Sequence, residues 1–146
     1  MSELIFFCAE DSDGSFASFS IDGLQWVQQQ VAATKKPSVI NMSLGGPMNN
    51  AVNAAVKSLT DSGIHVAVAA GNDNLPAEET SPASAETACT VGASDITDAR
   101  ASFSNYGPPV KIFAPGVSVT SSWIGSPTVC IVLFFSSSRS TEVSFI

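Results

Sequence analysis

Apolar residues in the middle of the chain recur at two spacings, one typical of helices and the other of buried strands. The first helical stripe consists of Ile21, Leu24, Val27 and Val31. Ser20 stands where it could cap this helix, and Asp22 would suit the positive end of its first turn. Pro37 should end the helix, because proline lacks a backbone donor and restricts the residue before it.

A buried strand and a second helix are predicted next. Residues 38–43 form a short apolar run, and residues 44–47 contain two glycines and a proline that should turn the chain. The second helix would carry Pro47 in its first turn and end at Gly63 in a left-handed conformation. Its apolar stripe is Met48, Val52, Ala55, Val56 and Leu59.

The remaining pattern predicts further short strands. Residues 64–69 are almost continuously apolar, as in a parallel strand that is buried on both faces. Beyond them the pattern gives a polar loop at 71–85, strands at 88–92 and 110–113, and a turn at 104–107. Helices and strands that alternate with right-handed crossovers predict an α/β layered fold with a mostly parallel sheet. The first ten residues and those from 126 onward fit no element, and the apolar run 129–135 would be an aggregation hazard if exposed.

The charge of the chain argues against several kinds of partner. Thirteen acidic and six basic residues give a net charge of −7, whereas binding of nucleic acid needs clustered Lys and Arg.

We expect no membrane span, because the longest apolar run has seven residues and a spanning helix needs about 20. The acidic N-terminal flank is unlike a signal peptide. Without CxxC spacing, Cys8, Cys89 and Cys130 are each expected to be buried thiols.

Ligand binding is expected at the carboxyl ends of the predicted parallel strands. Two loops rich in small residues lie there, at residues 43–46 and 69–72. Asn72 directly follows a buried strand, and a rigidly held amide can stabilise a developing oxyanion. The other interpretation is that Asn72 simply begins a turn.

Six motifs occur in series along the chain: KPSVINMSLGG (36–46), GIHVAVAAGN (63–72), SPAS (81–84), CTVGASD (89–95), SFSNYG (102–107) and IFAPG (112–116). In this order they resemble the subtilisin-like serine peptidases, particularly the fungal proteinase K type. Several motifs in series are far more specific than one. The resemblance implies a three-layer subtilisin-like fold with a mostly parallel sheet, of which the chain holds an incomplete part.

The resemblance implies a role for each matching residue. Asn72 matches the side-chain donor of the oxyanion hole, a group whose loss in subtilisin lowers turnover about 10²–10³-fold. Two segments match the walls of the primary specificity pocket: Ser43, Leu44 and Gly45, and Ala69, Ala70 and Gly71. Residues 43–45 would also pair with the backbone of a peptide or protein substrate as an added strand. The resemblance further implies an extracellular, secreted enzyme.

The Ser, His and Asp that the family mechanism requires have no counterpart in this chain. The family places its histidine in a His-Gly-Thr-His context and its serine in Gly-Thr-Ser-Met-Ala, and neither motif occurs here. The single histidine, His65, lies inside a predicted strand and is expected to pack in the core. We therefore expect a fragment of a serine endopeptidase that carries the oxyanion-hole and pocket segments but is inactive alone.

No cofactor or metal is expected. Family members often bind calcium near the strand at 110–112 through a carboxylate, but here Lys111 occupies that place. An ammonium group cannot ligate a hard cation and repels it. Cys89 matches a family cysteine whose disulfide partner lies in a segment that the resemblance does not cover, so it is expected to be a free thiol.

The resemblance divides the chain into three parts. Residues 1–10 are an unassigned tail, residues 11–126 are the central part of a subtilisin-like peptidase domain, and residues 127–146 are a tail without resemblance. Both tails could be translated intron sequence, so we expect a mis-predicted or truncated gene product, which transcript sequencing across the junctions would test. Alone, the chain should be a monomer or an aggregate, because strands meant for the middle of a sheet would have exposed edges.

Two other functions remain open from the residues. Residues 41–45 differ by one residue from a Gly-x-Ser-x-Gly nucleophile elbow, which would make Ser43 the nucleophile of an α/β-hydrolase-like esterase. Against this, the only histidine lies in the next strand and not in a late loop. The strand, the Gly45-Gly46 pair and the following helix also resemble the phosphate-cradling turn of a non-catalytic nucleotide-binding module, although GxGxxG and a Walker lysine are missing.

Overall fold

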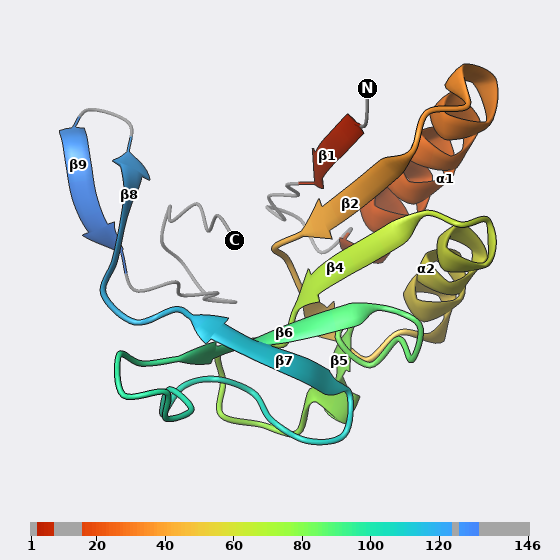
Figure 1. Ribbon diagram of the computed structural model, residues 1–146. Helices are drawn as coiled ribbons and strands as arrows, with labels where there is room; N and C mark the ends of the chain where they lie inside the picture. Colours follow the sequence, from red (N-terminus) through yellow and green to blue (C-terminus); the bar gives the residue numbers. More distant parts are fainter. Residues whose placement is uncertain (1–2, 8–15, 124–125, 132–146) are drawn as a thin grey trace.

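A parallel five-stranded sheet forms the centre of the molecule (Figure 1). The computed structural model describes residues 3–7, 16–123 and 126–131. The strands of the sheet lie in the order β1 (Glu3–Phe7), β2 (Ser38–Met42), β4 (His65–Ala69), β6 (Cys89–Ser94) and β7 (Val110–Pro115). Two small antiparallel pairs accompany it: β3 (Gly46–Pro47) with β5 (Thr80–Ser81), and β8 (Val119–Trp123) with β9 (Ser126–Ile131).

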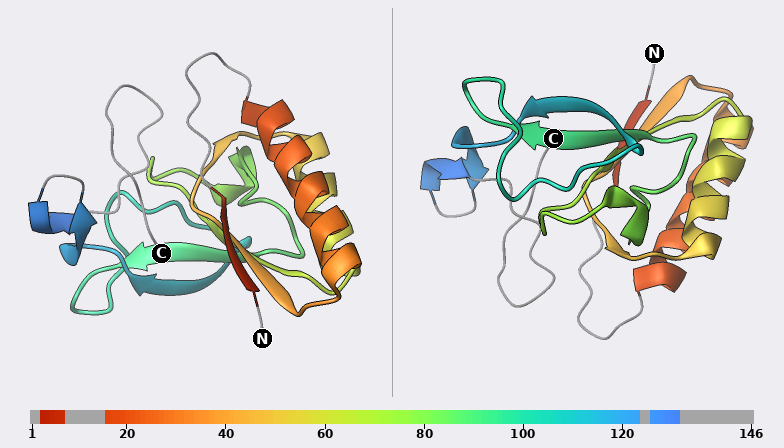
Figure 2. Two further views of the ribbon diagram at one scale, coloured as in Figure 1. Left: turned by 90° about the horizontal axis from the view of Figure 1, so that it is seen from above. Right: turned by 90° about the horizontal axis from the view of Figure 1, so that it is seen from below.

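Both helices cover the same face of the sheet. Helix α1 (Phe16–Thr34) connects β1 to β2, and α2 (Asn50–Asp61) lies between β2 and β4 in the chain. Two further views show the helices side by side on one side of the strands (Figure 2). The α/β class with a mostly parallel sheet is confirmed. The described residues form two layers, one of helices and one sheet, and a third layer is not among them.

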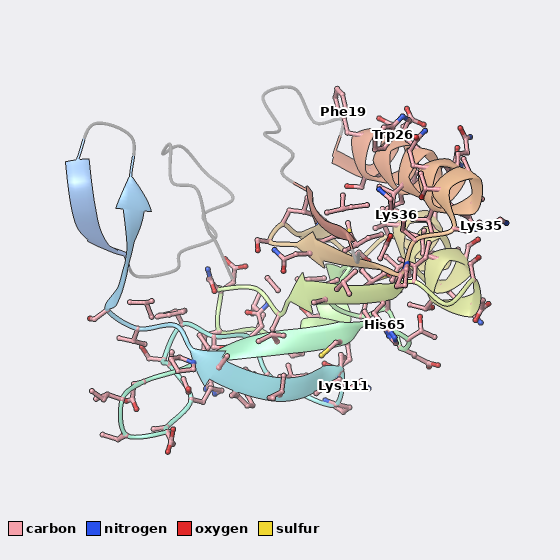
Figure 3. All side chains as sticks on the ribbon, turned by 45° about the horizontal axis from the view of Figure 1, so that its top comes forward. Phe19, Trp26, Lys35, Lys36, His65 and Lys111 are labelled. Carbon is pink, nitrogen blue, oxygen red and sulfur yellow. The ribbon has the colours of Figure 1, made fainter. Side chains whose placement is uncertain are left out.

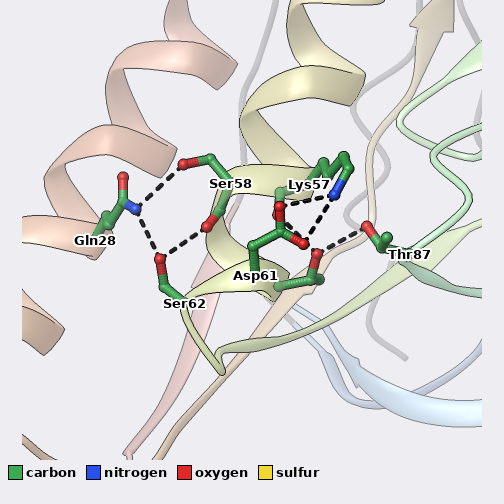
Figure 4. A network of polar contacts seen from close by, with 7 residues as sticks. Gln28, Lys57, Ser58, Asp61, Ser62 and Thr87 are labelled. Carbon is green, nitrogen blue, oxygen red and sulfur yellow. Dashed lines mark hydrogen bonds and ion pairs between the residues drawn. The ribbon is translucent and has the colours of Figure 1, made fainter.

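The core fills the space between the helices and the sheet. Both helices and the central strands contribute apolar side chains that are almost fully buried: Leu24, Val27, Ile40, Met42, Leu44, Val56, Leu59, Ile64, Val66 and Val68. Polar contacts close the outer side of the helix pair, where the amide nitrogen of Gln28 donates to the hydroxyls of Ser58 at 3.2 Å and Ser62 at 3.0 Å (Figure 4). The two helices are therefore fixed to each other on both sides.

The first helix begins earlier than the sequence predicts. Because α1 already includes Phe16, Ser20 lies within the helix and Asp22 lies beyond its first turn. The prediction that Ser20 caps this helix is wrong: its side chain is fully buried, and its hydroxyl has no partner in the described part of the chain. The end is as predicted, since the helix stops before Pro37, with Lys35 in a left-handed conformation at φ 57°.

The second helix is capped by a residue that the sequence pattern did not indicate. The side-chain oxygen of Asn49 accepts from the backbone N–H of Ala51 at 2.9 Å and of Val52 at 3.3 Å. Pro47 belongs to β3, so the prediction that it lies in the first helical turn is wrong. Gly63 closes the helix with a φ of 84°, as predicted.

Two strands lie where the pattern predicts no element. Residues 3–7 form β1, which pairs with β2 in a register that places Ile5 opposite Ile40. Residues 126–131 form β9, which pairs with β8. The expectation of no element is therefore wrong for both segments. The rest of the apolar run, residues 132–135, lies outside the described residues, and the division at residues 10 and 126 remains a prediction.

Candidate active site

The carboxyl ends of β2 and β4 bring the predicted site residues together. The two strands are parallel neighbours, and Met42 of β2 lies opposite Val68 of β4. The segments that leave these strands therefore start side by side at one edge of the sheet. They contain all of the residues assigned from the sequence: Ser43, Leu44 and Gly45, and Ala69, Ala70, Gly71 and Asn72.

The first segment is held rigidly at its start. Ser43 and Leu44 are buried, whereas Gly45 is exposed. The amide nitrogen of Asn41, a buried residue at the end of β2, donates to the Ser43 hydroxyl at 2.9 Å. This contact fixes the Ser43 side chain at the end of β2.

The second segment makes a tight turn at Gly71. Ala70 is buried, and its N–H donates to the carbonyl of Val91 at 2.8 Å, which ties the segment to β6. Gly71 has a φ of 104°, a conformation that other residues rarely adopt. Asn72 follows directly and is half-buried at this edge. The turn therefore sets the direction of the backbone at Asn72, close to the edge of the sheet where the first segment also begins.

A third segment, which the sequence analysis did not assign to the site, lies beside the other two. Strand β5 pairs with β3, and Ser81 lies opposite Gly46. The hydroxyl of Thr80 lies 3.2 Å from the carbonyl of Ala77 and 3.5 Å from that of Ala70. The SPAS motif begins at Ser81, but nothing in its local pattern indicates pairing with a segment more than 30 residues earlier.

Asn105 also contacts the site and was predicted only as part of a turn. Its side chain is fully buried, and its oxygen accepts from the N–H of Asp73 at 3.0 Å. The Ser-Asn-Tyr-Gly sequence is typical of turns, and these residues do stand in a loop. The burial of the side chain depends on a distant loop, so local sequence could not reveal it.

His65 lies away from this edge. It stands at the amino end of β4 and is exposed, so the prediction that it packs in the core is wrong (Figure 3). Its partner in β2 is Val39, four residues before Ser43, which corresponds to about 13 Å along the strand. His65 and Ser43 therefore do not form a nucleophile–base pair.

The remaining candidates lie on other strands. Cys89 is an exposed free thiol, so the expectation that it is buried is wrong; the same expectation for Cys8 and for the Cys130 side chain lies outside what the structure describes. Lys111 is exposed on β7 (Figure 3), and the expectation that its ammonium group disfavours calcium there stays a prediction. Within the described ranges, no group of three or more His, Cys, Asp or Glu side chains could hold a metal ion. None of the helices described there is long and apolar enough to span a membrane.

Comparison with known proteins identifies similar sequences and a similar structure. A family model described as "Subtilase family" matches residues 3–142. The chain is 52% identical over 120 residues to "Subtilisin-like serine protease AsES" of Sarocladium strictum, covering 81% of this chain and 31% of that protein. It is 51% identical over 119 residues to "Extracellular serine proteinase" of Thermus sp. strain Rt41A, covering 81% of this chain and 28% of the relative.

The fold also resembles that of a solved structure, the crystal structure of a cold adapted subtilisin-like serine proteinase. The TM-score is 0.75 at 38% sequence identity, and the match covers 88% of this chain and 45% of that chain. The chain thus spans less than half of the solved structure and about a third of the curated relatives that it matches.

Proposed function

The chain belongs to the subtilase family, and on that premise we propose that it is part of the catalytic domain of a serine endopeptidase. The observation that carries this proposal is the meeting of residues 43–45 and 69–72 at the carboxyl edge of β2 and β4. Its substrates would be peptides or proteins. The extracellular name of the Thermus relative supports an enzyme that acts outside the cell.

Each segment would have a distinct task toward a bound peptide. The exposed backbone near Gly45 would pair with an extended substrate, which is how strand addition supplies main-chain hydrogen bonds. The small residues from Ala69 to Gly71 would leave room for a substrate side chain beside them. Asn72 would donate its side-chain amide to the oxygen of the scissile carbonyl as negative charge develops there.

These groups stabilise a charge but cannot create the nucleophile. Attack on a peptide bond requires a serine with a histidine in hydrogen-bond reach, oriented by an aspartate. The one histidine of the sequence is His65, which lies on the other end of β4 from Asn72. We therefore propose that the 146-residue chain does not hydrolyse peptides alone.

Incubation of the purified chain with casein and with fluorogenic peptides tests this proposal. We expect no hydrolysis above the buffer blank, and no difference between the wild-type chain and the Asn72→Ala variant. Hydrolysis that a serine-protease inhibitor blocks, and that Asn72→Ala slows strongly, would contradict inactivity, because the chain would then supply its own nucleophile.

Labelling of the same purified chain with an active-site probe distinguishes the proposed function from that of an esterase that uses Ser43. A fluorophosphonate probe should leave Ser43 unlabelled, because this hydroxyl is buried and already accepts a hydrogen bond from Asn41. Stoichiometric labelling at Ser43, located by peptide mass spectrometry and lost in Ser43→Ala, would favour the esterase instead.

A further inference from the structure

Asn105 is a polar residue that is completely removed from solvent, with an exposed fraction of 0%. Its side-chain oxygen accepts from the N–H groups of Asp73 and Leu75, both at 3.0 Å. Its side-chain nitrogen donates to the carbonyl of Ala70 at 3.0 Å, and its own N–H donates to the carbonyl of Gly71 at 2.9 Å. One asparagine thus makes four hydrogen bonds to a single loop.

These four contacts lie on both sides of Asn72. Two are made to the carbonyls of the residues just before it, Ala70 and Gly71. The other two are made to N–H groups after it, at Asp73 and Leu75. The side chain and the backbone N–H of Asn105 therefore hold the chain on both sides of residue 72.

The fit between Asn105 and the turn leaves no room for a side chain at residue 71. A Cβ atom at Gly71 would lie 2.3 Å from the side-chain nitrogen of Asn105. The lack of a side chain at residue 71 therefore has two effects. It permits the φ of 104°, and it lets the side-chain amide of Asn105 approach the backbone of the turn. Gly71 and Asn105 act as a matched pair.

Further contacts join the two segments around Asn105. The N–H of Asn74 donates to the carbonyl of Phe103 at 2.7 Å, and the N–H of Tyr106 donates to that of Leu75 at 3.1 Å. Arg100 donates to the side-chain oxygen of Asn74 at 3.0 Å, and its guanidinium lies 5.0 Å from the centre of the Tyr106 ring. The loop that contains Asn72 is thus bonded along its length to residues 100–106.

We propose that Asn105 is the positioning residue of the oxyanion-stabilising amide, holding the turn at residues 70–75 so that Asn72 keeps one orientation. The inference rests on the proposed role of Asn72. A donor stabilises an oxyanion well only when it is held in place before the charge develops, because reorientation during the reaction would cost free energy. Asn105 supplies that rigidity without contacting the substrate.

The competing explanation is that Asn105 only stabilises the fold, as any satisfied buried polar group does. The two explanations predict that loss of the Asn105 side chain alters different parts of the molecule. A positioning residue changes the order of one loop, whereas a core residue changes the opening of the whole sheet.

The test measures hydrogen exchange by mass spectrometry on the full chain at micromolar concentration, where association is slow. In Asn105→Ser, amides in peptides covering residues 70–76 should exchange about tenfold faster or more, because the N–H groups of Asp73 and Leu75 both lose their acceptor, the side-chain oxygen of Asn105. Peptides from β2 and β4 should exchange at the wild-type rate. Asn53→Ser is the control, because it removes an asparagine amide on α2 that donates to Ser84 at 2.8 Å, away from the loop.

Asn105→Asp adds a readout that a general loss of stability would not give. A protonated carboxyl has the donor and acceptor pattern of the amide, whereas the ionised form cannot donate to the carbonyl of Ala70. The ionised carboxylate keeps an acceptor for the N–H groups of Asp73 and Leu75 and loses only the donor to Ala70. At neutral pH the amides of Asp73 and Leu75 should therefore stay more protected in this variant than in Asn105→Ser, in which both lose their acceptor.

The side chain of Asn72 itself is followed by ¹⁵N relaxation, with its amide signal assigned through its loss in Asn72→Ala. The order parameter of this side-chain amide should be lower in Asn105→Ser than in the wild-type chain, and that of the Asn72 backbone amide should fall from about 0.85 to below about 0.6. Three results would each overturn the proposal: a wild-type loop that exchanges like an unstructured peptide, a loop unaffected by Asn105→Ser, or equal losses in the loop, β2 and β4. None of these measurements uses peptide hydrolysis, so they stand or fall separately from the proposed function.

Discussion

The carboxylate of Asp95 organises the loop that follows β6. One of its oxygens accepts from the Thr97 hydroxyl at 2.7 Å, from the Thr97 N–H at 2.8 Å and from the Ala99 N–H at 3.1 Å. These bonds, the Thr97 hydroxyl first, hold the pKa of Asp95 below its usual value. Because the pKa is lowered on folding, the contribution to stability is present above the usual pKa and is lost as the pH falls through the folded pKa.

Replacing Thr97 with valine should raise the pKa of Asp95 toward its usual value, because the largest cause of the lowering is removed while the backbone donors remain. NMR titration of the Asp95 side chain measures the change. Thr87→Val is the matched control, since its hydroxyl interacts with Thr60 at 2.8 Å and not with this loop. An Asp95 titration that is the same in both variants would show that the Thr97 hydroxyl does not set the pKa.

Single residues also show what sequence alone can reveal about the site. The resemblance and the strand pattern place Asn72 and its neighbours at strand ends, and the parallel pairing of β2 with β4 brings these ends to one edge. Asn105 could not be found in this way, because its partners lie 30 to 35 residues earlier in the chain. The exposure of His65 was missed for a related reason, since an apolar run predicts a strand but does not show which side of the strand remains uncovered.

The cap of α2 allows a direct test of how one side chain stabilises a helix. Asn49→Ala removes the acceptor for the N–H groups of Ala51 and Val52, and should lower the free energy of unfolding by about 0.5–2 kcal/mol. Urea titration followed by circular dichroism measures the loss. Asn49→Asp should retain most of the stability, because a carboxylate caps equally well.

The neighbouring residue Asn50 supplies the control for this cap. It is the first residue of the helix and is exposed, so Asn50→Ala should change stability by only a few tenths of a kcal/mol. Equal effects of Asn49→Ala and Asn50→Ala would mean that the side-chain oxygen of Asn49 does not cap the helix.

The elements that were predicted correctly have an apolar pattern that is visible within a single segment of the sequence. The stripe of α2 buries Val52, Val56 and Leu59, and the apolar runs of β2 and β4 form central strands. Helix starts were harder, because several residues near each start can cap and only the packed structure selects one. Asn49 caps α2, and Pro47, predicted to lie in the first turn of this helix, belongs to β3; α1 begins before Ser20.

Pairing between distant segments accounts for the other differences. Strand β1 has five residues and is recognisable only beside β2, which begins at Ser38. Strands β3 and β5 have two residues each, too few to show a period. These strands form only because they pair with distant strands, so the sequence pattern of one segment alone does not predict them.

The two faces of the sheet differ in what covers them. The helices cover one face, on which Ile40, Val66 and Val68 are buried. On the other face, the alternation of the strands places mostly small or apolar residues, Val39, Ala67, Ala69, Val91 and Ala93, together with Asn41, His65 and Cys89. Such a face exposes apolar surface to other copies of the chain unless another layer covers it.

The edge of the sheet adds to this exposure. In the order of the described strands, β7 has a neighbour on one side only, so its outer backbone groups can pair with another chain. Ile112 and Phe113 of this strand are 55% and 42% exposed. Lys111 is the one charged residue of β7, and charge on an edge strand opposes such pairing.

Ile112→Lys should therefore reduce the self-association of the chain, because it places a second ammonium group on the open edge and removes an exposed apolar side chain. The onset of light scattering during concentration at neutral pH measures the effect, and we expect it to move to higher concentration. Ile96→Lys is the matched control: Ile96 is 100% exposed in a loop, so the charge change is the same but no strand edge is altered. If both variants delayed association equally, net charge would explain the effect and the edge of β7 would not be the surface through which copies meet.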